Sequence, residues 1–257
     1  MPYGGNTNLP DDSMAAEVQV NAKSIDSNGV FRIASWNLQA FGDSKASDSN
    51  LLNYYASKMR DYNIVVVQEI RDADGSAFKK LCALLPDYNC LASSRAGTTS
   101  SKEQYGIIFR GAGILEQHDY NEPGFRMKFE RPPFAVKFRL GQHTFTVLIL
   151  HAKPSDVERE LENLQALADS LGGEVIVLGD LNADCDYYGE DSGAAFSNWL
   201  WAIPDSEDTT VSPNTDCTYD RIILNGEAKV GFVGYGVMND VNSDASDHYL
   251  VWAGFRN

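Results

Sequence analysis

Two short polar clusters adjoin apolar strands in the second half of the chain. The sequence Gly-Asp-Leu-Asn-Ala-Asp at residues 179–184 directly follows the apolar run at 175–178, and Ser-Asp-His at 246–248 directly precedes the run at 249–252. Carboxylate, carboxamide and imidazole groups at the ends of buried strands cost free energy unless something pairs with them. A divalent metal ion and a phosphate group would pair with both clusters, whereas capped strand ends and polar turns would explain one cluster more readily than two.

The same arrangement recurs at four further strands. The groups are Asn37 after residues 33–36, Glu69 after 64–67, His151 after 146–150 and Asp220 before 221–224. Continuous apolar runs of four or five residues, rich in β-branched side chains, are typical of strands that are buried on both faces. Each of the six strands therefore presents a group that can bind a metal ion or transfer a proton, and coincidence is a poor explanation of that pattern.

An ordered set of motifs resembles the endonuclease/exonuclease/phosphatase superfamily. The motifs are Trp-Asn at 36–37, Gln-Glu at 68–69, His-Ala-Lys-Pro-Ser-Asp at 151–156, Gly-Asp-Leu-Asn-Ala-Asp-Cys at 179–185, Cys-Thr-Tyr-Asp-Arg at 217–221 and Ser-Asp-His-Tyr at 246–249. Within the superfamily the chain is most similar to the deoxyribonuclease I family, through residues 101–105, residues 201–206 and the Cys185/Cys217 pair. Any one motif is weak, but the collinear set over residues 31–257 is specific.

The resemblance implies one catalytic domain, residues 31–257, folded as a four-layer α-β-β-α sandwich of two mixed sheets with outer helices. The order of elements alone leaves a barrel and a sandwich both open. Residues 1–30 are rich in Asn, Asp, Ser and Gly and show no hydrophobic period, so we expect a flexible N-terminal tail.

Three helices are expected, over residues 48–62, 155–171 and 194–201. In the second, Ser155 followed by Glu158 predicts a capping box, and Gly172 with Gly173 predicts the helix end. Its apolar stripe is Val157, Leu161, Leu164, Ala168 and Leu171.

Hydrolysis of a phosphodiester requires a water nucleophile, a base, an acid and stabilisation of charge on phosphorus. The resemblance implies that His248 is the general base and His151 the general acid. It also implies a carboxylate partner for each imidazole, Asp220 for His248 and Glu103 for His151, which would fix the tautomer. Of the four histidines, the remaining two, His118 and His143, lie in polar stretches and are expected at the surface.

The resemblance makes Asn37, Glu69 and Asp247 the expected ligands of a divalent cation. A set of oxygen ligands without Cys suits Mg²⁺, Mn²⁺ or Ca²⁺ rather than Zn²⁺. Asp180 and Asn182 are expected to bind or orient either a second cation or the scissile phosphate and its water. We therefore expect Mg²⁺ (or Mn²⁺) as cofactor, with Ca²⁺ in addition.

Substrate and calcium residues follow the family pattern less closely. Arg71, Arg131 and Tyr187 match DNA contacts of the family, whereas Thr98, Thr99, Ser101 and Gln39 replace an arginine, an asparagine, a tyrosine and a further arginine. These changes should weaken duplex affinity, and the protein is expected to accept single strands or RNA more readily than its relatives. Asp208 and Thr210 match one structural calcium loop; a second loop is not recognisable at residues 121–132. The actin-binding strand is unmatched near Cys90, so actin binding is not expected.

The bulk composition constrains partners and compartment. The 257 residues, 43% of them hydrophobic, carry 21 basic and 36 acidic side chains, a net charge of −15. An acidic protein should bind DNA weakly and in a salt-sensitive way, helped by a local basic strip and by bound divalent cations. No apolar stretch approaches the ~20 residues that span a bilayer, so no membrane association is expected. A monomer is expected.

The cysteines bear on the compartment. The resemblance implies a disulfide between Cys185 and Cys217, while Cys82 and Cys90 could equally form a local disulfide or remain buried thiols. One disulfide favours an oxidising, extracellular compartment, although the start of the chain has no signal-peptide pattern and no Asn-x-Ser/Thr acceptor occurs.

The leading functional hypothesis is a divalent-metal-dependent endonuclease that hydrolyses DNA with low sequence specificity and leaves 5′-phosphate ends. The alternative is another phosphoesterase of the superfamily, such as an abasic-site endonuclease/exonuclease or a sphingomyelinase-like enzyme, because the core residues are shared. A catalytically inactive binding domain would have little reason to keep both histidines, both partners and all the metal carboxylates.

Overall fold

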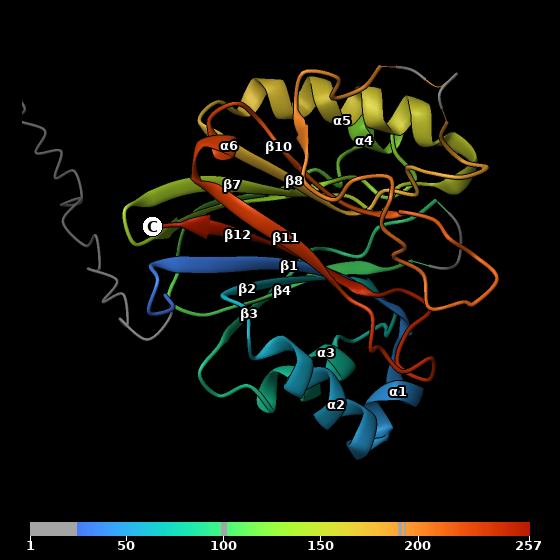
Figure 1. Ribbon diagram of the computed structural model, residues 1–257. Helices are drawn as coiled ribbons and strands as arrows, with labels where there is room; N and C mark the ends of the chain where they lie inside the picture. Colours follow the sequence, from blue (N-terminus) through green and yellow to red (C-terminus); the bar gives the residue numbers. More distant parts are fainter. Residues whose placement is uncertain (1–24, 99–101, 190–191, 193) are drawn as a thin grey trace, which may run out of the picture.

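Two six-stranded mixed sheets pack face to face in the computed structural model, which describes residues 25–98, 102–189, 192 and 194–257 (Figure 1). The first sheet has the order β11 (Phe232–Met238), β12 (Leu250–Arg256), β1 (Val30–Phe41), β2 (Ile64–Ile70), β4 (Gln104–Phe109) and β3 (Asn89–Ala92). The second has the order β5 (Gly113–Asp119), β6 (Phe134–Leu140), β7 (His143–Ile149), β8 (Glu174–Asp180), β10 (Asp220–Leu224) and β9 (Leu200–Trp201).

Helices cover the outer faces of both sheets (Figure 1). Helices α1 (Asp43–Ser47), α2 (Ser49–Met59) and α3 (Ser76–Ala83) lie on the first sheet, and α5 (Val157–Leu171), preceded by the 3₁₀ turn η2 (Pro154–Asp156), lies on the second. The short helices α4 (Pro123–Arg126) and α6 (Ala228–Gly231) complete the set. The predicted four-layer α-β-β-α sandwich is confirmed.

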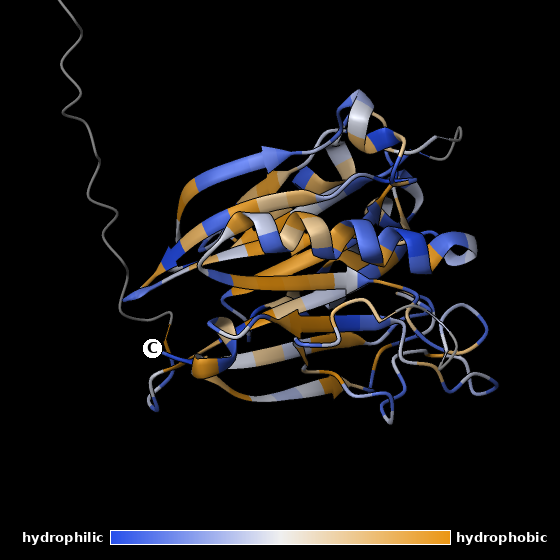
Figure 2. Cartoon of the chain, turned by 90° about the horizontal axis from the view of Figure 1, so that it is seen from above, coloured by the Kyte–Doolittle hydropathy of each residue, from blue (hydrophilic) through white to orange (hydrophobic). Residues whose placement is uncertain are grey.

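Three apolar cores separate the layers. Phe31, Val66 and Val147 belong to the core between the sheets, while alternate residues of the same strands, such as Val65, face the helices. Figure 2 shows accordingly that many strand segments are hydrophobic in colour. The strands are thus buried on both faces, which explains why the sequence shows continuous apolar runs instead of strict alternation.

Strand directions bring the polar strand ends to one place. β1 runs parallel to β2, and β7 runs parallel to β8. β12 is antiparallel to β1, and β10 is antiparallel to β8 with Asp220 opposite Asp180. The start of an antiparallel strand lies beside the end of its neighbour, so the groups just before β12 and at the start of β10 come close to those late in β1 and at the end of β8.

The helix predictions hold in part. Helix α2 begins one residue after Asp48, whose side chain accepts hydrogen bonds from Asn50 N and Leu51 N. Helix α5 keeps the predicted apolar face and ends at Gly172 with φ of 65°, but it begins at Val157, and its N-cap residue Asp156 makes no side-chain capping bond. The predicted capping box is therefore wrong, because Pro154 and Ser155 form a separate 3₁₀ turn.

The helix expected at residues 194–201 is also wrong. Leu200 and Trp201 form the edge strand β9, and Trp201 pairs with Ile223 of β10. Phe196 has a φ of 57°, which an α-helix does not accommodate. Most of the expected tail, residues 1–30, lies outside the described residues; within the described part, Asp26 to Val30 forms a hydrogen-bonded turn that leads into β1. In the described part of the chain no helix is long and apolar enough to cross a membrane.

Candidate active site

The strand ends of the two sheets meet at Asp180, the last residue of β8. Asn37, on β1 of the other sheet, donates from Nδ2 to Asp180 Oδ2 at 2.9 Å and to Glu69 Oε1 at 3.2 Å. Asp180 and Asn37 are 2% and 1% exposed. The hydrogen bond therefore joins the two sheets at their polar edge and brings the predicted groups of β1, β2 and β8 together.

Two imidazoles face the same oxygen of Asp180. His151 Nε2 lies 3.4 Å and His248 Nε2 lies 3.6 Å from Asp180 Oδ2. Each ring is held from behind by a buried carboxylate, since His151 Nδ1 lies 2.5 Å from Glu103 Oε1 and His248 Nδ1 lies 2.7 Å from Asp220 Oδ2. The structure thus forms both expected His–carboxylate pairs and directs both Nε2 atoms at one point.

The carboxylates favour the protonated form of both imidazoles. Burial opposes protonation of His248, but Asp220 and Asp180 outweigh it and raise its pKa to about 10. Burial likewise opposes protonation of His151, and Glu103 leads the interactions that nevertheless raise its pKa. Burial would raise the pKa of Asp180, yet the two imidazoles hold it below its ordinary value. The centre is therefore an alternating array of negative and positive charges.

The end of β8 and the loop after it each contain a residue with positive φ. Gly179 has a φ of 142°, and a Cβ there would overlap the carbonyl oxygen of Leu150. This close approach brings β8 against the segment that carries His151. Asn182, with a φ of 50°, donates from Nδ2 to Ala152 O at 3.0 Å, and its backbone N–H donates to Asp180 Oδ1. Asn182 therefore lies between Asp180 and the segment that carries His151.

Strained backbone gathers around the predicted metal ligands. Gln39, Ala40 and Glu69 have φ values of 47°, 53° and 60°, in the left-handed region that side chains rarely adopt. Ala40 N donates to Glu69 Oε2 at 2.7 Å, and Gln39 N donates to Asn37 Oδ1 at 2.9 Å. Backbone strain persists where surrounding contacts enforce it, and it is common at functional sites.

Asp247 is the expected ligand that lies outside the buried network. Its side chain is 56% exposed, and Oδ1 lies 3.8 Å from His248 Nε2. It lies near the same half-buried ammonium as Glu69: burial lowers the pKa of Lys45, and the carboxylates of Asp247 and Glu69 oppose that shift. Asp247 and Glu69 thus border the centre from one side.

Three positioning groups were missed from the sequence. Lys45 Nζ donates to Leu38 O at 2.9 Å and to Ala245 O at 2.8 Å, which ties the end of β1 to the loop before His248. Thr209 Oγ1 accepts from Asp220 N at 3.1 Å, and the Ser246 hydroxyl donates to Asn37 O at 2.6 Å. Ser246 and Thr209 belonged to matched segments but were given no positioning role, and a lone Lys on the short helix α1 carried no signal.

The expected DNA contacts have different surroundings. Arg71 is 40% exposed and pairs with Glu69 Oε2 at 2.7 Å. Arg131 is 14% exposed and is turned inward: Nε donates to His151 O at 2.9 Å and lies 3.2 Å from Glu103 Oε1. Tyr187 is 43% exposed and lies beside Tyr219, whose ring in turn lies 6.5 Å from that of His248. Tyr187 thus extends an aromatic row from the centre to the surface.

The loop that departs from the family pattern is described only in part. Thr99 and Ser101 lie outside the described residues. Thr98 is exposed, and its backbone N–H donates to Glu130 Oε1 at 2.8 Å, with its hydroxyl bonded to the other oxygen of the same carboxylate. Of the two histidines expected at the surface, His118 is 52% exposed, whereas His143 is half-buried between Phe31 and Glu174.

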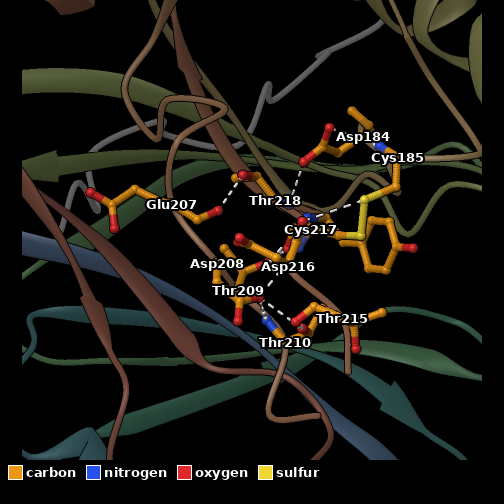
Figure 3. Close-up of a disulfide and its surroundings, with 12 residues drawn as sticks. Asp184, Cys185, Glu207, Asp208, Thr209, Thr210, Thr215, Asp216, Cys217 and Thr218 are labelled. Atoms are coloured by element: carbon orange, nitrogen blue, oxygen red, sulfur yellow. Dashed lines mark hydrogen bonds between the residues drawn. A yellow bond between two sulfur atoms is a disulfide. The ribbon is translucent and has the colours of Figure 1, made fainter. Parts of the chain in front are cut away.

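Both cysteine pairs form disulfides. The bond between Cys185 and Cys217 confirms the prediction, and Cys82 bonds to Cys90, which decides between the two readings of that pair. Figure 3 shows Cys185–Cys217 next to the Asp208 loop. Asp208 Oδ1 accepts from Thr210 N at 2.9 Å and from Thr210 Oγ1 at 2.7 Å, so the expected calcium residues contact each other.

The Asp208 loop is coupled to the loop that carries His248. Val211 N donates to Asp247 O and Tyr249 N donates to Thr209 O, each at 2.8 Å, and Thr210 forms an antiparallel bridge with His248. The disulfide, this loop and the His248 segment therefore form one connected wall beside the centre.

Comparison with known proteins identifies relatives along most of the chain. The model of the Endonuclease/Exonuclease/phosphatase family matches residues 34–248. Deoxyribonuclease-1 of Gallus gallus is 36% identical over 86% of this chain and 91% of its own length. Deoxyribonuclease-1 of Homo sapiens is 32% identical over 86% and 90%, and human Deoxyribonuclease gamma is 30% identical over 89% and 87%.

Solved structures share the fold at low sequence identity. Zebrafish (D. rerio) TDP2 complexed with a single strand DNA product superposes with a TM-score of 0.64 at 14% identity, covering 90% of this chain and all of that one. An endonuclease/exonuclease/phosphatase from Bacteroides vulgatus gives 0.64 at 15% identity, covering 88% and 98%. From the matched family model and these relatives, the chain belongs to the endonuclease/exonuclease/phosphatase family, and within it to the deoxyribonuclease I-like proteins.

Proposed function

We propose that this protein is a divalent-metal-dependent endonuclease that hydrolyses phosphodiester bonds of DNA with low sequence specificity and leaves 5′-phosphate ends. One observation carries the proposal: two imidazoles, each backed by a buried carboxylate, direct their Nε2 atoms at Asp180 Oδ2 from 3.4 and 3.6 Å. A pair of acid–base groups around one point is the arrangement that in-line displacement at phosphorus requires.

The two imidazoles take opposite roles in the proposed reaction. His248 Nε2 accepts a proton from the attacking water, and the new P–O bond forms as the P–O3′ bond breaks. His151 Nε2 donates a proton to the departing 3′ oxygen, so the products are a 3′-hydroxyl and a 5′-phosphate. Asp220 and Glu103 keep each ring in the tautomer that presents Nε2 and stabilise the imidazolium.

Asp180 and Asn182 are proposed to bind or orient either a second cation or the scissile phosphate and its water. Asn37 and Asn182 hold the Asp180 carboxylate from both of its oxygens, at 2.9 and 3.2 Å. The carboxylate is thereby fixed between the imidazoles, where it orients a water molecule or a second cation. The fixed geometry avoids reorganisation during the reaction.

The donor set fits a hard divalent cation. Glu69, Asp247 and Asn37 offer carboxylate and carboxamide oxygens, the ligands that Mg²⁺ and Mn²⁺ prefer. When bound, such an ion would polarise the phosphoryl oxygen and lower the pKa of nearby groups through its charge. Without a cation the neighbouring carboxylates raise the pKa of His248 to about 10, which would leave it protonated at neutral pH. A bound cation would lower that pKa and so favour the unprotonated form that a general base needs. Asp208 and Thr210 are proposed to hold one structural Ca²⁺.

DNA is the proposed substrate because relatives at 30–36% identity are deoxyribonucleases. Arg71 and Tyr187, both partly exposed beside the centre, are proposed to contact the strand. Two disulfides support an extracellular location. We also propose that the protein acts as a monomer without binding actin.

Cleavage of supercoiled plasmid tests the proposal. Wild type with Mg²⁺, with and without Ca²⁺, should nick undamaged plasmid, EDTA should abolish nicking, and the nicks should be closed by a ligase that requires 5′-phosphates. His151→Ala and His248→Ala should lose activity, while His118→Ala, a change at an exposed ring, should retain it. Activity that survives both active-site substitutions would contradict the mechanism. Turnover of an abasic-site oligonucleotide or of sphingomyelin without plasmid nicking would instead support the alternative, another phosphoesterase of the superfamily.

A further inference from the structure

Helix α5 carries a fully buried carboxylate on its otherwise apolar face. Glu160 is 0% exposed and lies three residues after Val157 and four before Leu164, both of which are also buried. Burial raises the pKa of the Glu160 carboxyl. A buried carboxylate is expensive unless hydrogen bonds satisfy it, so its partners indicate what it does.

The partners of Glu160 are the backbones of two separate segments. Oε1 accepts from Glu130 N at 2.6 Å, and Oε2 accepts from Lys153 N at 3.0 Å. The first segment continues directly into Arg131, and the second begins two residues earlier with His151. One carboxylate therefore fixes the spacing between the chain that carries Arg131 and the chain that carries His151.

That spacing controls the His151 pair. Arg131 donates from Nε to His151 O at 2.9 Å and from Nη2 to Ala152 O at 3.0 Å, and its Nε lies 3.2 Å from Glu103 Oε1. Tyr105 joins the same unit, because its hydroxyl donates to Arg131 O and accepts from His151 N. A change in the distance between the two segments would move His151 relative to Arg131 and Glu103, and would therefore disturb the His151–Glu103 hydrogen bond.

We propose that Glu160 is a positioning residue that holds His151 in register with Glu103 and Arg131. The inference rests on the proposed function, in which His151 protonates the leaving oxygen. One part of the proposal involves no substrate: the His151–Glu103 hydrogen bond depends on the Glu160 carboxylate of α5. Glu160 itself touches neither imidazole in the described structure; it acts through two backbone N–H groups.

Graded substitutions separate this role from simple packing. Glu160→Gln keeps the shape and one oxygen acceptor but turns an amino group toward the second N–H, whereas Glu160→Met removes both acceptors. We expect kcat to fall about tenfold in Glu160→Gln and about 100-fold in Glu160→Met, with KM changed less than about threefold, because a small displacement of a catalytic group is costly. The matched control is Leu164→Ala, which removes a buried side chain one turn along the same face.

The experiment measures kcat and KM for plasmid nicking by the four proteins at a temperature where circular dichroism shows each one folded. In parallel, NMR of ¹⁵N-histidine-labelled protein follows the downfield Nδ1 proton of His151, assigned through its loss in His151→Asn. The expected result is a weakened or shifted Nδ1 resonance in Glu160→Gln, with Leu164→Ala unchanged in both resonance and kcat.

Two results would overturn the proposal: an unaltered Nδ1 resonance in folded Glu160→Gln, or a kcat loss in Leu164→Ala equal to that of Glu160→Gln. If Glu160→Met does not fold, Glu160→Gln alone decides. The NMR readout needs no substrate, so a wild-type protein that fails to nick plasmid would refute the proposed function while the resonance still tests the role of Glu160.

Discussion

Replacement of Asp220 by Asn tests the His248 pair most directly. Asp220 is fully buried, and its Oδ2 lies 2.7 Å from His248 Nδ1. At that separation and an effective dielectric constant of about 20, two unit charges interact by about 6 kcal/mol, which is an upper bound for the pair. Asn removes the charge and offers either a neutral oxygen or an amino group to Nδ1. The second choice selects the tautomer in which Nε2 carries the proton and cannot act as a base.

We expect kcat of Asp220→Asn to fall about 10³- to 10⁴-fold, as in other His–carboxylate pairs whose acid is converted to an amide. This loss corresponds to about 4–5.5 kcal/mol of activation free energy, which lies within the electrostatic bound. The fold should survive, because burial raises the pKa of Asp220 to about 6 and a neutral side chain is cheaper to bury there.

The assay is the initial rate of plasmid nicking at saturating DNA, with the folded fraction measured by circular dichroism. Asp244→Asn is the matched control, since Asp244 is an exposed carboxylate four residues before His248. It should keep wild-type kcat. A loss smaller than tenfold in folded Asp220→Asn would refute the reasoning that the carboxylate sets the tautomer and charge of His248.

Three further predictions concern stability, each measured by urea unfolding. Gly179→Ala should cost about 2–4 kcal/mol, because its Cβ would overlap Leu150 O at positive φ; a cost below 1 kcal/mol would contradict this. Cys185→Ser should cost about 3–4 kcal/mol and Cys82→Ser about 2–3, since the disulfides close separations of 32 and 8 residues; the reverse order would be inconsistent with loop closure. In EDTA, wild type should lose stability relative to His248→Asn between about pH 6.5 and 10, because the pKa of His248 is raised to about 10 on folding. The loss of unfolding free energy should be on the order of 1–3 kcal/mol, because the coupled rise in the Asp220 pKa reduces it. Parallel plots of stability against pH for the two proteins would contradict this prediction.

The sequence was sufficient to predict which side chains meet when those side chains lie on or beside regular strands. Asp180 and Asp220 lie at strand ends and Asn37 lies in the last part of β1, and pairing direction brings these positions to one edge. The same logic placed His151 and His248, because each adjoins a buried strand by one or two residues. The helix at residues 155–171 was found through its period of apolar side chains, which depends on burial and not on details of its ends.

Groups whose role depends on side-chain direction could not be placed in this way. Arg131 was assigned to DNA by motif position, yet it turns inward to Glu103, a choice made by the buried carboxylate and two carbonyl oxygens. Glu160 occupies a core position of α5, and its only sequence signal is a charge inside an apolar stripe. Trp201 was read as helical because β9 is two residues long, too short to show a strand period.

The pairing of the site's arginines bears on how a protein with a net charge of −15 can act on a polyanion. Arg131 is 14% exposed and contacts Glu103, and the more exposed Arg71 pairs with Glu69, so these carboxylates offset much of the positive charge that the two arginines bring to the site. Binding through surface counterion release would then be small, since it scales with the number of phosphates neutralised. In the proposed function, attraction for phosphate would come chiefly from the centre, where His151 faces Asp180 and where oxygen ligands would hold a divalent ion. We therefore expect affinity and catalysis to depend on the same few groups, so that recognition rests on the phosphodiester backbone with little contribution from base sequence.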